Sequence, residues 1–212
     1  RTLISKGFLR QAKEHAKRLG DEIHRLDPAG RLPIIGLEPS EIFTLRDEFL
    51  DYFPGSEWVK ALSERAYMID EFLVRPDATG MPRLTNIILK NRSKDNSTDV
   101  LLHGHCYQKA QPPSKDGFPT GVAATVAMLE NVGYSVTTIK DGCCGMAGAF
   151  GYEAEHYSLS MQVGGLSLFP AVNESGTSIV AAAGISCKSQ IEDGTGKRAV
   201  HPITLISRLI GQ

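Results

Sequence analysis

The sequence is poor in the features that mark membrane, secreted and nucleic-acid-binding proteins. No apolar run approaches the ~20 residues that span a bilayer, and no secretory signal is visible. Four cysteines are too few for a disulfide scaffold in 212 residues, and a formal net charge of −1 leaves no basic stripe for nucleic acid. We therefore predict a globular protein of a reducing, cytoplasmic compartment that uses its thiols for metal binding.

The few cysteines fall at informative places. Cys143 and Cys144 are adjacent in the glycine-rich segment 141–151, where glycine permits sharp bending of the backbone. Such a turn lets two thiols grip one metal, whereas a disulfide between them would strain the intervening peptide. Cys106 and Cys187 each follow an apolar, strand-like run. Because ligands of open α/β sheets bind outside the carboxyl ends of strands, we predict that all four thiols form one site. The alternative is that the adjacent pair packs as small buried side chains in a tight turn.

Apolar periodicity predicts an alternation of helices and strands, hence an α/β fold with mostly parallel sheets flanked by helices. The expected helices cover residues 3–19, 40–53 (with Ser40 as N-cap), 56–73, 121–131, 152–168 and 202–210. The expected strands cover residues 32–37, 87–90, 100–103, 135–139 and 179–183.

The two halves of the chain show a similar order of expected helices, strands and turns, which predicts two pseudo-repeats with the first one truncated. Residues 1–80 read as the back portion of one repeat, and residues 84–212 as the whole of a second. The Pro- and Gly-rich stretch 77–84 is the expected boundary. The chain opens with Arg1, inside an apparent helix, so we expect a fragment of a longer polypeptide.

A family resemblance rests on three motifs: Gly104-His105-Cys106 with Lys109, Cys143-Cys144-Gly145, and Gly184-Ile185-Ser186-Cys187. They resemble the cysteine-rich CCG domain, which typically occurs in tandem. That domain is found in the iron–sulfur subunits of glycolate oxidase, anaerobic glycerol-3-phosphate dehydrogenase and heterodisulfide reductase. It also forms the C-terminal part of fused FAD-linked oxidases of D-2-hydroxy acids such as D-lactate or D-2-hydroxyglutarate. Residues 148–153, Gln190-Ile191 and His201-Pro202 fit this fused branch best.

The resemblance implies an iron–sulfur cluster, of [4Fe–4S] type, held by Cys106, Cys143, Cys144 and Cys187. Two departures are visible. Glu41 stands where many members of the family carry a cysteine, and Gln190 stands where they close a Cys-x-x-Cys motif. The first repeat is therefore expected to have lost any cluster, and the second to keep its four thiols.

The histidines have different expected roles. His105, beside Cys106, is a candidate ligand or proton donor, and His201 is a candidate ligand that approaches from the start of the last helix. His103 is expected to be a packed core residue, and His156 an exposed helix residue. Glu153 is either a hydrogen-bond partner of a bound group or a residue favoured at a helix start by the helix dipole.

The function implied by the resemblance is electron transfer in an FAD-linked D-2-hydroxy-acid dehydrogenase or oxidase. The expected partners are an FAD-binding domain or subunit of that enzyme and a quinone or carrier protein as electron acceptor. Through such partners the protein would also reach the inner face of the membrane. No catalytic residue is assigned, and this chain alone should be inactive, since nothing in it binds FAD. The alternative is a docking module stapled by a single zinc or iron ion on Cys106, Cys143 and Cys187 with His105 or His201.

Overall fold

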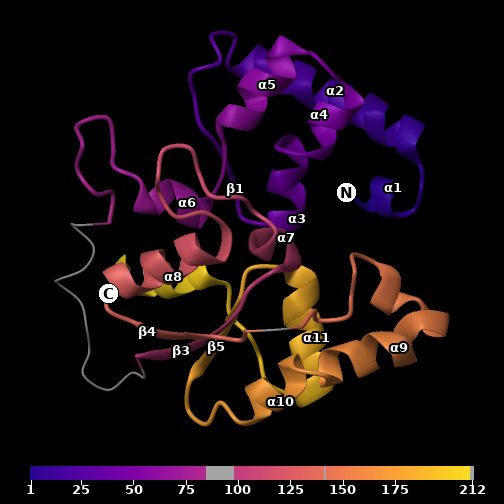
Figure 1. The fold of residues 1–212 in the computed structure, drawn as a ribbon, viewed down its shortest axis with the longest axis vertical. Coiled ribbons are helices and arrows are strands. Elements are labelled where there is room, and N and C mark those ends of the chain that lie inside the picture. Colours follow the sequence, from indigo (N-terminus) through magenta and orange to yellow (C-terminus); the bar gives the residue numbers. More distant parts are fainter. Residues whose placement is uncertain (85–97, 141, 211–212) are drawn as a thin grey trace. The chain divides into compact units, whose positions relative to one another are not determined.

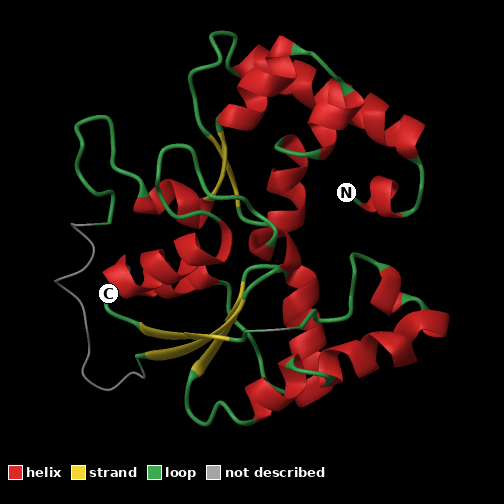
Figure 2. Ribbon diagram, viewed as in Figure 1, coloured by secondary structure: helices red, strands yellow, loops and turns green. Residues whose placement is uncertain are grey.

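The computed structural model of the chain describes residues 1–84, 98–140 and 142–210 and divides into two compact units. The predicted α/β class is confirmed, since each unit holds a parallel sheet flanked by helices (Figures 1 and 2). Unit 1, Arg1–Met68, contains α1 (Thr2–Ser5), α2 (Leu9–Leu26), β1 (Ile34–Gly36), α3 (Pro39–Ile42), a 3-10 turn (Phe43–Leu45), α4 (Glu48–Tyr52), α5 (Glu57–Glu64) and β2 (Ala66–Met68). Unit 2, Ile69–Gln212, contains α6 (Ile69–Val74), β3 (Asp99–His103), α7 (Cys106–Lys109), α8 (Gly121–Asn131), β4 (Ser135–Thr138), a 3-10 turn (Phe150–Tyr152), α9 (Ala154–Gly165), α10 (Leu168–Asn173), β5 (Ile179–Ala182), α11 (Ile185–Thr195) and α12 (Pro202–Ile210).

Unit 1 is built on a two-stranded sheet in which β1 runs parallel to β2, with Ile34 opposite Ala66. The α2 helix packs through small residues. A side chain at Gly20 would place its Cβ 2.5 Å from the Trp58 ring. Glycine at this position therefore allows α2 and α5 to approach closely.

Unit 2 is built on a three-stranded parallel sheet in the order β4-β3-β5. Successive strand residues face opposite sides of a sheet. Val100 and Leu102 pack with buried residues of α8 and α12, whereas Leu101 packs with the cluster formed by α10, α11 and the cysteines. Figure 1 shows α8 and α10 on opposite faces of the sheet. The cysteine site therefore belongs to the α10/α11 face.

Several predicted elements of unit 1 are divided by local backbone chemistry. The helix expected over 3–19 breaks at Gly7, which has a φ of +78°. The helix expected over 40–53 is α3, a 3-10 turn and α4, and it begins with Glu38 as N-cap rather than Ser40 because proline follows. The helix expected over 56–73 was wrong as one element, since β2 separates α5 from α6.

In unit 2 the predicted helices 121–131 and 202–210 are confirmed, and the strands match β3, β4 and β5 closely. The helix expected over 152–168 ends at Gly165, and α10 begins anew at Leu168. The strand expected at 87–90 lies outside the described residues. The compact units divide after Met68, so the stretch 77–84 lies inside unit 2.

Candidate metal-binding site

The predicted site lies where β3, β4 and β5 end. The β3 strand finishes at His103 and leads to Cys106, β4 leads to the cysteine turn, and β5 leads to α11, which carries Cys187 in its first turn. Because these strands are parallel, their carboxyl ends meet at one edge of the sheet. The topology thus brings residues that are distant in sequence to one edge of the sheet.

Three side chains converge most closely. The potential ligand atoms of His103, Cys144 and Cys187 all lie within 4.8 Å of one another, and all three residues are buried. The Nδ1 atom of His103 is buried without a hydrogen-bond partner. A buried imidazole nitrogen without a partner is costly, and coordination of a metal would satisfy it.

Cys143 lies at the edge of this group and is half-buried. Its thiol shares a hydrogen bond with Cys144, and its Sγ accepts a hydrogen bond from the Gly145 N–H at 3.3 Å. Lys109 closes the turn from the other side, since its Nζ donates to the Gly142 carbonyl at 3.0 Å. The adjacent thiols are thus held by backbone and by a lysine from the β3 exit.

Cys106 stands apart from the converging group. It is exposed at the first position of α7, and its Sγ lies 3.8 Å from His105 Nδ1. Among the described residues, the close group of ligand atoms around Cys144 does not include it. The structure therefore brings together Cys143, Cys144 and Cys187 and leaves Cys106 beside His105.

The two histidines predicted as ligands both cap helices. His105 is the N-cap of α7, and its Nδ1 accepts from the Tyr107 N–H at 3.1 Å. His201 precedes α12, and its Nδ1 accepts from the Ile203 N–H at 3.2 Å. His103, expected only as a core residue, is the histidine found among the thiols. Its signal in the sequence was strand alternation, because it lies two residues beyond Leu101 on the cysteine-bearing face.

Close backbone packing fixes the cysteine turn. Gly145 has a φ of +94°, and a Cβ there would lie 2.1 Å from the carbonyl oxygen of Ser160. Ser160 is held in turn by Gln190, whose Nε2 donates to the Ser160 carbonyl at 3.1 Å and to its hydroxyl at 2.9 Å. Gln190 therefore supports the turn through Ser160.

The charge states follow from burial. A hydrogen bond to Cys144 and burial raise the pKa of the Cys143 thiol well above its ordinary range. The hydrogen bond from Cys143 lowers the pKa of Cys144, but the hydrogen bond with Cys187 and burial outweigh it and raise that pKa to about 12. Burial, with the charges of Lys109 and His105, lowers the pKa of His103 to about 4. A bound cation reverses the preference of the thiols, since coordinated thiols are deprotonated.

This donor set fits a soft or borderline metal. Thiolates favour iron–sulfur clusters and zinc, and a neutral imidazole suits zinc or iron. The residues that could hold such a group are Cys143, Cys144, Cys187 and His103, with Cys106 at the exposed rim of α7.

A second group of potential ligands lies near the start of α9. Glu153, Glu155 and His156 have ligand atoms within 4.8 Å of one another. Glu153 Oε2 lies 2.9 Å from His156 Nδ1, and the His156 ring stacks on Phe150 with centroids 4.0 Å apart. The group is half-buried or exposed, and the ion pair and the ring stack account for its arrangement. We assign it no ligand.

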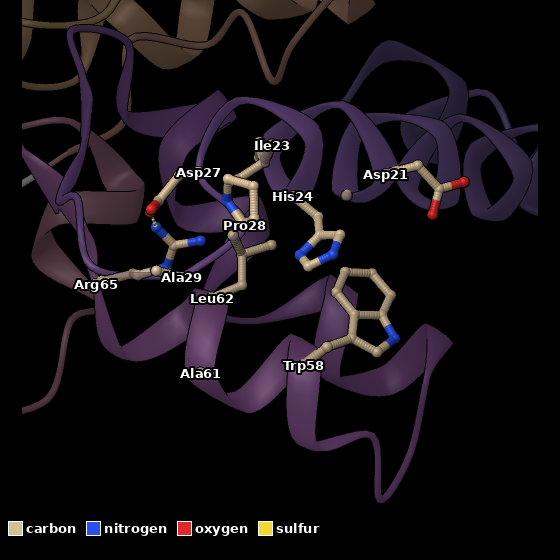
Figure 3. Close-up of a pocket in the computed structure, with 12 residues that line it drawn as sticks. Asp21, Ile23, His24, Asp27, Pro28, Ala29, Trp58, Ala61, Leu62 and Arg65 are labelled. Atoms are coloured by element: carbon tan, nitrogen blue, oxygen red, sulfur yellow. Dashed lines mark hydrogen bonds and ion pairs between the residues drawn. The ribbon is translucent and has the colours of Figure 1, made fainter.

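Unit 1 contains a cavity of about 370 Å³ between α2 and α5. Figure 3 shows His24 beside Trp58 in its wall, and the Asp27–Arg65 ion pair at another part. Asp27 Oδ2 and Arg65 Nη1 are 2.5 Å apart. The lining includes no cysteine, and the ion pair joins the loop after α2 to the end of α5.

Comparison with known proteins identifies two kinds of relative. The chain is 29% identical over 211 residues to a subunit of the anaerobic glycerol-3-phosphate dehydrogenase of Escherichia coli (strain K12), covering 98% of this chain and 48% of that protein. It is 27% identical over 217 residues to the D-2-hydroxyglutarate dehydrogenase of the same strain, covering 97% of this chain and 18% of that protein. The corresponding dehydrogenase of Pantoea ananatis is 24% identical over 216 residues.

No family model and no solved structure matches the chain. Among the described helices, none has the length and apolar character to cross a membrane. The chain spans about half the length of the glycerol-3-phosphate dehydrogenase subunit and less than a fifth of the D-2-hydroxyglutarate dehydrogenase. It is thus similar, over nearly all of its own length, to part of a dehydrogenase subunit and to part of a dehydrogenase.

Proposed function

We propose that this chain is the iron–sulfur region of an FAD-linked 2-hydroxy-acid oxidoreductase and passes electrons from the flavin to an acceptor. Support comes from the relatives, which are a dehydrogenase and a subunit of one. The observation that carries the proposal is the convergence of Cys144 and Cys187, with Cys143 alongside, at the carboxyl ends of parallel strands.

Cys106, Cys143, Cys144 and Cys187 would hold a [4Fe–4S] cluster, because four thiolates are its usual ligand set. The cluster, when bound, exchanges single electrons, whereas a flavin takes up two from its substrate. The protein's own contribution is to position the thiols. Gly145 lets the turn approach α9, Lys109 holds the Gly142 carbonyl, and the Gly145 N–H donates to Cys143.

A second candidate function is a structural or docking module closed by one zinc or iron ion. One observation favours it, since the imidazole of His103 lies among the thiols and its Nδ1 has no hydrogen-bond partner. In this form Cys143, Cys144, Cys187 and His103 complete a four-ligand site. The ligand set differs from the one expected from the sequence, where His105 or His201 supplied the nitrogen.

The proposed tandem organisation, with residues 1–80 and 84–212 as the two repeats, is supported by strand order. In unit 1, β1 leads through α3, α4 and α5 to its parallel neighbour β2, after which the chain enters α6 of unit 2. In unit 2, β5 leads to α11, then to Val200, which bridges Ala181 in parallel, and then to α12. The expected partners remain an FAD-binding domain or subunit and a quinone or carrier protein, in the cytoplasm or at the inner membrane face.

Single cysteine-to-serine variants test the two functions against each other. Each of the four would be purified without oxygen and analysed for iron, zinc and acid-labile sulfide, with Ser189→Ala on α11 as a control that removes no thiol. If the chain binds a cluster, Cys106→Ser should lose iron and sulfide to the same extent as Cys144→Ser. Retention of one metal ion by Cys106→Ser, with its loss from Cys144→Ser, supports the single-ion module. Full metal content in every variant contradicts both.

A further inference from the structure

Gly184 marks a place where His105 and Cys187 face the same small space. A side chain at Gly184 would put its Cβ 2.4 Å from His105 Cδ2, 3.1 Å from His105 Nε2 and 3.3 Å from Cys187 Sγ. Because Gly184 has no side chain, the Cδ2–Nε2 edge of the His105 imidazole and the Cys187 sulfur can both lie next to this position.

The hydrogen bonds of His105 define its tautomer. Its Nδ1 accepts the Tyr107 N–H at 3.1 Å, so in the neutral ring the proton resides on Nε2. The backbone N–H of His105 donates to Gln108 Oε1 at 3.2 Å, which completes a capping box at the start of α7. The ring therefore presents an N–H group, rather than a lone pair, on its Nε2 side.

Buried contacts hold this orientation. Gln108 is buried, and its Nε2 donates to Asp70 Oδ2 at 3.2 Å and to Thr125 Oγ1 at 2.9 Å. These contacts orient the side-chain amide of Gln108 with its oxygen toward the backbone N–H of His105. Asp70 and Thr125 thus hold the capping box, and the capping box holds the His105 imidazole in place.

We infer that His105 is a hydrogen-bond donor to the Cys187 sulfur, through Nε2–H, and not a metal ligand. The inference rests on the proposed function, in which Cys187 binds the metal centre as a thiolate. An N–H donor to a ligating sulfur stabilises the more negative, reduced form and so raises the reduction potential. For a single ion, the same bond orients the ligand and supports metal affinity.

Two variants remove the donor in different ways. His105→Asn keeps an oxygen that can cap α7 but has no Nε2–H. Gly184→Ala keeps a backbone that alanine adopts, with φ −75° and ψ 136°, and displaces the ring. The matched control is Gly165→Ala, where the new Cβ meets only Phe169 Cδ2 at 4.0 Å.

Iron content and reduction potential of the purified protein test the inference. His105→Asn and Gly184→Ala should keep wild-type iron and favour the reduced form about tenfold less, a drop of about 59 mV for a one-electron couple. If the wild-type centre does not change redox state, Co²⁺ titration replaces the potential, and both variants should bind Co²⁺ at least about tenfold more weakly. Gly165→Ala should match wild type in either measurement.

The contrary outcomes are distinct. Loss of the metal from His105→Asn would identify His105 as a ligand and overturn the inference, as would wild-type potential and Co²⁺ affinity in both variants. A wild-type protein that binds neither a cluster nor Co²⁺ overturns the proposed function itself. In that case ¹⁵N NMR of the His105 ring still tests the tautomer, and a proton on Nδ1 would refute the donor role.

Discussion

At the scale of single residues, His103 distinguishes the two proposed metal centres, because it is a ligand of the single ion and not of the cluster. It is a neutral imidazole among buried thiols, and burial is the main reason for its lowered pKa. The sequence indicated that His103 is buried, but the alternation of a strand does not reveal which distant side chains share its face. That juxtaposition depends on the β3–β5 register, in which His103 pairs with Ala182.

Replacement of His103 by leucine should leave the cluster in place. Four thiols suffice as ligands, and leucine removes a buried nitrogen atom that has no hydrogen-bond partner. We expect wild-type iron and sulfide, and a free energy of unfolding of the metal-free protein that is unchanged or higher by about 1 kcal/mol. Metal analysis and denaturant titration measure these quantities. Loss of metal would instead make His103 a ligand and favour the single-ion module.

The buried carboxyl of Asp70 should make stability depend on pH. Burial raises its pKa to about 6, although hydrogen bonds from Thr125 and the Glu71 N–H oppose the shift. A raised carboxyl pKa means that the fold favours the protonated form. Its stabilising effect is complete below the unfolded pKa and is lost as pH rises through about 6.

The expected loss of unfolding free energy is about 2 kcal/mol between about pH 4 and pH 7, since each unit of pKa shift corresponds to about 1.4 kcal/mol and part of the shift acts below about pH 4. Asp70→Asn should flatten this part of the profile, because the amide does not titrate. Asp193→Asn, exposed on α11, is the control and should keep the wild-type slope. Urea titrations at several pH values provide the measurement, and equal slopes for wild type and Asp70→Asn would contradict the assignment.

At the scale of elements, helices and strands that follow long apolar runs were predicted from the sequence. Elements whose bounds depend on local interruptions of those runs were missed. The helices 121–131 and 202–210 carry continuous apolar faces and were found at the predicted bounds. Strand β2 was missed because three residues give too little alternation to distinguish from a helix. Within the site, the convergence of Cys143, Cys144 and Cys187 was predictable because these residues follow the ends of predicted strands. The exposure of Cys106 was not, because it depends on the turn into α7.

The cysteine turn depends on glycine at position 145. Alanine there would combine a strained φ with a Cβ 2.1 Å from the Ser160 carbonyl oxygen. We expect Gly145→Ala to lower the free energy of unfolding by about 2–4 kcal/mol and to abolish metal binding. Gly196→Ala is the control, since its φ is also positive but no atom lies within 4 Å, and it should cost about 1 kcal/mol. Equal effects in the two variants would show that the close contact is unimportant.

At the scale of the whole molecule, the proposal places the metal centre in unit 2 and gives unit 1 no ligand. A bound metal should then stabilise unit 2 by mass action and leave local opening within unit 1 unchanged. Hydrogen exchange with and without a chelator measures this difference. We expect chelation to lower protection in β3, β5 and α11 and to leave local exchange in α2 as it was. A loss of protection that is larger in α2 than in α11 would place the metal elsewhere.

The ratio of acid-labile sulfide to iron in anaerobically purified protein tests the central proposal most directly. A [4Fe–4S] cluster on Cys106, Cys143, Cys144 and Cys187 predicts equal amounts of iron and sulfide, up to about four of each per chain, with visible absorbance that bleaches on reduction. One zinc or iron ion per chain without sulfide would contradict the cluster and leave the single-ion module in its place.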